Sequence, residues 1–182
     1  FAYKMLPREK EIMESSQFQS MIRHRIHHPE CSKPEYNIMQ HSKIDFVMYV
    51  INNKLLSADY YAWTDFGYFQ DPTRVSDKCL NLNKFELDKV NFQGIYALTD
   101  RDKSVGYTLT HAPERIGGFF YLGSPELLSR YQLLYHQVCD EFYRIGIVDD
   151  DQHIMIQCVF REPDLFKVWV LGGWHLTYRY FQ

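Results

Sequence analysis

The sequence predicts one α/β domain, because helix-like and strand-like segments follow one another along its 182 residues. The first observation is an amphipathic helical pattern from Tyr36 to Asn53, which leads into a short aromatic and β-branched run that ends at Asp65. The second is a clearly delimited helix between Ser124 and Gly146. A chain of this length buries roughly 70% of the surface that its unfolded form exposes, so one core without disulfides is sufficient.

Ahead of this helix-strand unit, Pro29 and Pro34 predict a hinge that ends any helix running from Arg8 to Ile26. After the unit, Phe69 to Lys89 has the composition of a loop, with a turn signal at Asp71-Pro72. No long linker separates these segments, so they fit one domain.

Three short β-type segments come next, at Val90–Leu98, Tyr107–His111 and Ile116–Leu122. The last of them contains Gly117 and Gly118, where missing side chains allow either the close approach of a ligand or a β-bulge. Both interpretations stay open on the sequence alone.

The C-terminal third holds the most secure helix. Ser124 is a suitable N-cap, Pro125 fits the first helical position, and Gly146 ends the apolar face. A short helix from Gln152 to Phe160, capped by Asp149 or Asp150, and a strand from Phe166 to Leu171 complete the prediction.

Composition excludes several classes of partner. The net charge of −3 gives no electrostatic footprint for nucleic acid, and the basic cluster Arg23–His28 is short and half histidine. No apolar run approaches the ~20 residues of a membrane span, and no signal peptide is evident. The four cysteines lack a CxxC spacing and fit reduced core thiols, so we expect a cytoplasmic protein.

Two acidic positions stand out as chemical candidates. Asp65 ends a predicted strand, where an acid is either a cation ligand or an ordinary turn residue. The run from Asp149 to Asp151 brings together three carboxylates that repel one another, which favours a raised pKa, although acids are also common helix caps. His175, after two glycines, is either a ligand or a satisfied histidine. P-loop, dinucleotide and zinc-ligand spacings are absent.

Several of these motifs occur together in a recognisable order between Pro29 and the C-terminus. They are Pro34-Glu35-Tyr36-Asn37, Ser42-Lys43, Trp63-Thr64-Asp65-Phe66-Gly67-Tyr68, Gly117-Gly118, Asp150-Asp151-Gln152 and Trp174-His175. In this combination the chain resembles the HtrL/YibB-type glycosyltransferases and is similar to the N-terminal domain of a large chlorella virus glycosyltransferase.

The resemblance implies a GT-A-like fold: a mixed, mainly parallel central sheet flanked by helices. In such folds, acids at the end of the sheet hold Mn²⁺ or Mg²⁺ against the diphosphate of a nucleotide sugar. Asp65 matches the first of these acids, Gly67 stands where the second is expected, and His175 would supply a replacement ligand. The family begins with a strand that cradles the nucleotide base. None is evident before Lys4, so we expect residues 1–182 to form one domain that lacks this strand and belongs to a larger protein.

The same resemblance assigns roles to the remaining candidates. Lys43 would meet phosphate, and Gly117 and Gly118 would line the sugar pocket, with Gln152 also in the donor site. Asp151 is the expected general base, with Asp150 as its alternate.

The sequence thus predicts a metal-dependent glycosyltransferase that moves a hexose from a UDP-sugar to a glycan hydroxyl, with inversion. A non-catalytic carbohydrate-binding domain and a metal-dependent phosphohydrolase are the alternatives.

Overall fold

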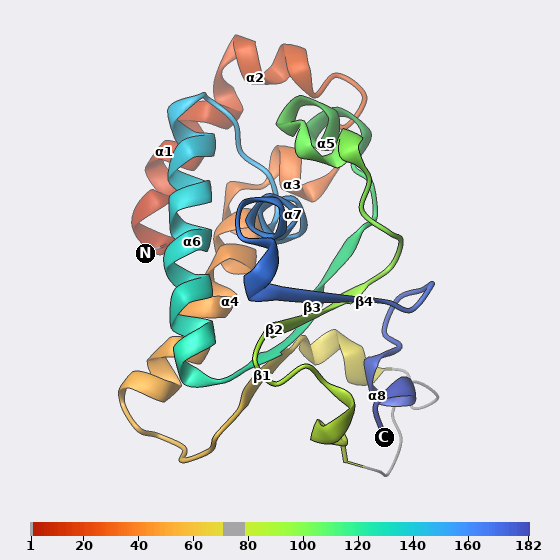
Figure 1. Ribbon diagram of the computed structural model, residues 1–182. Coiled ribbons are helices and arrows are strands. Elements are labelled where there is room, and N and C mark those ends of the chain that lie inside the picture. Colours follow the sequence, from red (N-terminus) through yellow and green to blue (C-terminus); the bar gives the residue numbers. More distant parts are fainter. Residues whose placement is uncertain (1, 71–78) are drawn as a thin grey trace.

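The computed structural model describes residues 2–70 and 79–182 (Figure 1). Its helices are α1 (Ala2–Glu14), α2 (Ser16–Met21), α3 (Pro29–Ser32), α4 (Pro34–Asn52), α5 (Val105–His111), α6 (Pro125–Arg144), α7 (Asp151–Arg161) and α8 (Thr177–Tyr180). Its strands are β1 (Tyr61–Thr64), β2 (Val90–Gly94), β3 (Ile116–Gly123) and β4 (Phe166–Val170). Short 3-10 helices are η1 (Phe66–Gln70), η3 (Leu82–Lys84), η4 (Asp100–Lys103) and η5 (Pro163–Leu165).

The sheet has the strand order β1-β3-β2-β4. Strand β3 is antiparallel to both β1 and β2, and only β2 and β4 pair in parallel. The mixed α/β class is therefore confirmed, but within the described residues the sheet is not mainly parallel as expected. The chain between β2 and β3 forms η4 and α5 at the end of the sheet, so β3 returns beside β2 in the opposite direction.

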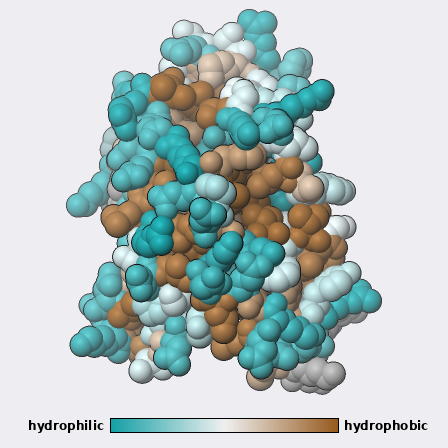
Figure 2. Space-filling view, in the orientation of Figure 1, coloured by the Kyte–Doolittle hydropathy of each residue, from teal (hydrophilic) through white to brown (hydrophobic). Residues whose placement is uncertain are grey.

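Helices cover one face of the sheet more heavily than the other. Helices α4, α6 and α7 pack on one face and share its large apolar core, whereas α8 and η1 lie at the other side (Figure 1). Figure 2 shows hydrophobic residues gathered across the middle of the visible face, with hydrophilic residues above and below. None of the helices in the described ranges is long and apolar enough to cross a bilayer.

The strongest helix signals in the sequence are confirmed. Helix α6 begins after Ser124, whose side chain accepts a hydrogen bond from Leu127 N, and Gly146 adopts a positive φ of 74° just after the helix ends. Helix α7 begins after Asp150, which accepts from Gln152 N. Local capping chemistry therefore fixes both boundaries.

Helix α4 is also confirmed, but the face that it buries differs from the expected one. Met39 and Phe46, two apolar residues of the amphipathic pattern, are exposed, whereas the polar side chains of Asn37, His41 and Lys43 are buried. Each of these three side chains makes at least one hydrogen bond: Asn37 donates to Glu9, His41 pairs with Tyr135, and Lys43 binds two carboxylates. An apolar periodicity could not reveal this arrangement.

Two other expected elements are wrong. The predicted strand at Tyr107–His111 is helix α5, because Ser104 caps its first turn by accepting from Tyr107 N. The two prolines do not form a hinge; each occupies the first turn of a helix, in α3 and α4. Of the predicted loop at Phe69–Lys89, residues 71–78 lie outside the described residues, and the rest includes η3.

The contact of α1 with α4 depends on a buried acid. Glu9 is fully buried and accepts a hydrogen bond of 2.7 Å from the Asn37 side chain. Burial raises the pKa of Glu9 from 4.5 to about 7, against the opposing effect of Asn37. The folded state therefore binds this proton more tightly than the unfolded state does.

Replacement of Glu9 by Gln tests this assignment. Because the folded pKa is raised, the contribution of Glu9 to the free energy of unfolding falls as pH rises from about 4.5 to about 7. In Glu9→Gln this loss disappears, so the variant gains on the order of 3 kcal/mol relative to wild type across that window. Urea unfolding at several pH values measures it. Glu11→Gln, an exposed change in the same helix, is the control, and parallel pH profiles for wild type and Glu9→Gln would contradict the assignment.

Candidate functional site

A buried ammonium group connects three elements of the fold. Lys43 Nζ on α4 donates to Asp151 Oδ2 at 2.8 Å, to the carbonyl oxygen of Gly118 at 2.9 Å and to Asp65 Oδ2 at 3.1 Å. The other carboxylate oxygen of Asp65 accepts from Trp63 Nε1 at 2.6 Å. The structure thus brings together four sequence-predicted site residues that lie far apart in the chain.

The sheet register explains how Asp65 reaches this point. Strand β1 ends at Thr64 opposite Phe120 of β3, and the next residue, Asp65, donates its backbone N–H to Phe119 O. Because the two strands are antiparallel, the end of β1 lies beside the start of β3, where Gly118 is found. Asp65 therefore does end a strand, as predicted, although this strand is an antiparallel edge strand.

The two glycines of β3 make room for protein side chains. A Cβ on Gly118 would lie 2.3–2.6 Å from the carboxylate of Asp151, and one on Gly117 would lie 2.1–2.8 Å from the ring of Phe119. The register of β2 with β3 also shifts between Phe92 and Gly94, which fits the β-bulge interpretation of these glycines, and the close approach of a ligand stays a prediction. Gly118 allows α7 to press its first residue against the sheet.

Lys43 is charged in this position, and its three N–H groups are all used. Burial lowers the pKa of Lys43, but the carboxylates of Asp151 and Asp65 outweigh this effect and raise it above its ordinary value. Burial also raises the pKa of Asp151, which opposes ionisation of the acid, while Lys43 lowers it. The charged ammonium of Lys43 decides the charge state of the pair, because it is stabilised by two carboxylates and a carbonyl oxygen. Asp151 is therefore ionised against it. In this arrangement Lys43 has no N–H left to donate to a phosphate, as the resemblance had implied it would.

Asp150 and Asp151 are adjacent but point to different surroundings. Asp151 faces Lys43, whereas Asp150 caps α7 and lines a pocket of about 220 Å³. Burial, the largest effect, raises the pKa of Asp150 to about 7, with Asp149 and Asp151 adding to it and His153 opposing it. A carboxyl group with this pKa exchanges protons near neutral pH.

Beneath the pocket, charges are paired within the protein. His153 Nδ1 lies 2.7 Å from Asp149 Oδ2, and Arg25 Nη2 lies 2.7 Å from Glu30 Oε1 and 3.6 Å from Asp149 Oδ1. Burial lowers the pKa of His153, but the opposite effect of the Asp149 carboxylate is larger and brings the pKa to about 9. The imidazole is therefore protonated and donates to Asp149.

The pocket combines charged, amide and aromatic side chains. Its lining includes Arg25, His28, Glu30, Tyr36, Glu114, Asp150, Gln152, His153 and Trp174. Larger hollows of about 570 Å³ near α1 and α3 and about 420 Å³ between α1 and α6 have no acidic candidate residue in their lining. We place the candidate site at the smaller pocket because the perturbed carboxyl group opens there.

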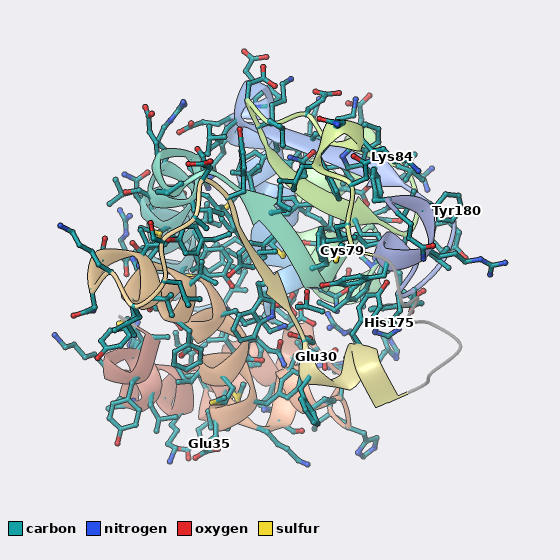
Figure 3. The ribbon with its side chains drawn as sticks, turned by 90° about the horizontal axis from the view of Figure 1, so that it is seen from below. Glu30, Glu35, Cys79, Lys84, His175 and Tyr180 are labelled. Atoms are coloured by element: carbon teal, nitrogen blue, oxygen red, sulfur yellow. The ribbon has the colours of Figure 1, made fainter. Side chains whose placement is uncertain are left out.

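His175 lies beside the end of β1 on an aromatic support. Its ring centroid is 4.5 Å from that of Phe119 and 5.1 Å from that of Tyr68 in η1. Figure 3, seen from below, shows His175 and Glu30 near the point where β1 runs into η1. His175 also has a positive φ of 57°, an uncommon conformation for a residue other than glycine. Tertiary contacts therefore determine the backbone conformation around His175.

Gln93 of β2 holds this segment in place. Its side-chain oxygen accepts from Leu176 N, Thr177 N and Thr177 Oγ1, and its Nε2 donates to Gly173 O at 2.7 Å. The buried amide thereby fixes both sides of the turn that carries Trp174. Nothing in the sequence around Gln93 indicated this role.

The residues at the end of β1 have the ligand types that Mn²⁺ or Mg²⁺ requires. Asp65 is one-third exposed at its side chain and carries carboxylate oxygens, and the imidazole of His175 packs against the ring of Phe119. With Lys43 against Asp65 and Asp151, the local formal charge is −1, which attracts a cation. Both oxygens of Asp65 already accept hydrogen bonds, from Lys43 and from Trp63, so an ion held here would share these oxygens.

A second group of ligand types occurs in the described part of the chain. Atoms of Asp149, Asp150 and His153 lie within 4.8 Å of one another. His153 is protonated and already donates to Asp149, so it lacks the free lone pair that a metal ligand needs at neutral pH. We therefore assign no ion to this group.

Sequence patterns missed the residues that surround the acids. Arg25 belongs to a short basic run that gave no indication of a site, Glu30 carried no signal of its own, and Tyr36 lay in a resemblance motif without an assigned role. These residues line the same pocket as Asp150 only because of the tertiary fold, and the spacing of residues along the chain could not predict that. His153 alone had a visible signal, three residues after Asp150 on one helix face.

Loss of the central ammonium should destabilise the fold strongly. Lys43→Met leaves the buried Asp151 carboxylate unpaired, so we expect a loss of about 3–5 kcal/mol in the free energy of unfolding. Adding Asp151→Asn should restore part of this loss, because the unpaired charge is then removed. Exposed Lys33→Met is the control, with an expected change of about 0.5 kcal/mol or less. Equal effects of Lys43→Met and Lys33→Met in chemical unfolding would contradict the assignment.

Comparison with known proteins places the chain in a family. A family model described as a bacterial protein of unknown function, HtrL_YibB, matches residues 3–182. Protein HtrL of Escherichia coli (strain K12) is 27% identical over 183 residues, which cover 96% of this chain and 63% of that protein. This chain thus spans less than two thirds of the length of that curated relative. No solved structure matches. The similarity to a viral glycosyltransferase domain stays a prediction. Since the family model covers nearly every residue, the chain belongs to the HtrL/YibB family.

Proposed function

We propose that the protein is a glycosyltransferase that moves a hexose from a UDP-sugar to a hydroxyl group of a glycan. One observation carries the proposal. Two acids have different surroundings: Asp65 is partly exposed at a strand end, and Asp150 is buried at a pocket with its pKa raised to about 7. Glycosyl transfer needs one group that helps to neutralise the leaving diphosphate and another that accepts the proton of the acceptor hydroxyl, and these two acids suit the two tasks.

Asp150 is our proposed general base. With a pKa of about 7, Asp150 is largely deprotonated above pH ~7 and accepts a proton from the acceptor hydroxyl. Gln152 Nε2 lies 3.4 Å from Asp150 Oδ2 and helps to orient the carboxyl group. We assign Asp151, the residue first expected as the base, a positioning role, because it is held against Lys43 and anchors the start of α7.

Asp65, together with His175, is proposed to hold Mn²⁺ or Mg²⁺, which would neutralise the leaving diphosphate. Lys43 keeps the Asp65 carboxylate in place from behind, and Trp63 fixes its second oxygen. Displacement by a base opposite the leaving group predicts inversion at the sugar carbon.

A carbohydrate-binding domain without catalysis is the second candidate. It is favoured by Gly67 in place of a second acid and by Lys43, whose ammonium already satisfies Asp65 and Asp151. The two candidates differ in one measurable property, turnover of a nucleotide sugar.

Asp65→Asn should abolish metal-dependent donor binding. In wild type, UDP-sugar at about 100 times its Kd with Mn²⁺ should raise the melting temperature by roughly 5–10 °C. Without the carboxylate the ion is no longer held against the diphosphate, so this rise should vanish in the variant. Asp59→Asn, an exposed acid before β1, is the control. An undiminished Mn²⁺-dependent shift in Asp65→Asn would remove Asp65 from the site.

Asp150→Asn should reduce kcat by roughly 100-fold or more while leaving donor affinity nearly unchanged. Asn caps helices as well as Asp does, so the start of α7 is preserved. In wild type kcat/KM should rise with pH through about 7 as Asp150 loses its proton, and the variant should lose this rise. Exposed Asp164→Asn is the control. Full activity in Asp150→Asn would show that this acid is only a helix cap.

A further inference from the structure

Every cationic side chain in the lining of the pocket at Asp150 is already paired within the protein. Arg25 is paired with Glu30 and Asp149, and His153 is paired with Asp149. An anionic ligand would lose its hydration in the pocket, find no free cation, and face the carboxyl groups of Asp150 and Glu114. The lining thus disfavours anionic ligands.

The lining retains hydrogen-bonding capacity. Asp150 lines the pocket with a carboxyl group, and Gln152 lines it with an amide that both donates and accepts. A hydroxyl group, which donates one hydrogen bond and accepts two, matches such a mixed lining. At about 220 Å³ the pocket has room for roughly seven water molecules, which approaches the size of one sugar ring.

An aromatic surface closes the pocket on one side. Trp174 lines it, remains 40% exposed and packs against Phe119 with ring centroids 5.5 Å apart. Because Gln93 holds Gly173 and the start of α8, the indole is fixed in place before any ligand arrives. A rigid, partly exposed aromatic ring suits contact with the apolar face of a sugar.

We propose that this pocket binds one monosaccharide unit that carries no acidic group, against Trp174 and with its hydroxyl groups toward Asp150 and Gln152. On the proposed function, on which the role as acceptor subsite rests, the acceptor glycan ends in such a sugar. Uronic acids are excluded because every cation in the lining is already paired. The binding itself requires neither nucleotide nor metal.

Calorimetry on the full chain in EDTA, without nucleotide, tests the proposal with two methyl glycosides. Methyl glucoside should bind, whereas its uronic acid counterpart should bind at least about tenfold more weakly. Trp174→Ala should weaken the neutral ligand about tenfold, which corresponds to about 1.4 kcal/mol, and Trp174→Phe should restore part of the affinity. Tyr180→Ala is the matched control, since Tyr180 is an exposed aromatic residue of α8 that lies at the outer edge of the molecule in Figure 3.

Three results would overturn the inference: no binding of methyl glucoside, equal binding of a charged glycoside, or unchanged affinity in both Trp174 variants. The Mn²⁺-dependent UDP-sugar shift is measured on the same preparations. If that shift is present and the glycosides fail, the subsite falls and the proposed transferase stands. If the glycosides bind and the shift is absent in wild type, the pocket stands as a carbohydrate-binding site without the transferase.

Discussion

The arrangement of the site depends on one buried ion cluster, the ammonium of Lys43 between Asp65 and Asp151. Each charge in this cluster would be costly alone in the interior, and together they hold α4, β1, β3 and α7 in one register. Gly118 adds a carbonyl and, through its missing side chain, the space for Asp151. The sheet edge and the start of α7 are therefore fixed relative to each other.

This constraint gives two neighbouring acids separate roles. With Asp151 drawn toward Lys43, the preceding residue of the helix start turns to the pocket, where burial holds its proton until neutral pH. The network of Arg25, Glu30 and His153 supplies paired charges around it. On the proposed function, the role of Asp150 as a base depends on how Asp151 is anchored, because Asp150 both caps α7 and lines the pocket.

Local signals in the sequence predicted what local chemistry controls. The start of α6 at Ser124, the cap at Asp150 and the acid at the end of β1 all follow from neighbouring residues. Features that depend on distant contacts were not accessible. The resemblance implied a phosphate contact for Lys43, and only the fold shows that its ammonium pairs with two acids. The buried polar residues of α4 also interrupt its apolar periodicity. The direction of β3 was likewise decided by the path of the chain through α5, in a segment that alternates like a strand.

The central claim is that the fold tunes the carboxyl group of Asp150 for proton transfer near neutral pH. Titration of its side-chain carboxyl carbon by NMR, assigned by comparison with Asp150→Asn, measures this property directly in the absence of any substrate. The account predicts a midpoint near 7, shifted from the ordinary value of 3.8 by burial. A midpoint close to the ordinary value would show that the acid is solvated and unperturbed, and would contradict the account.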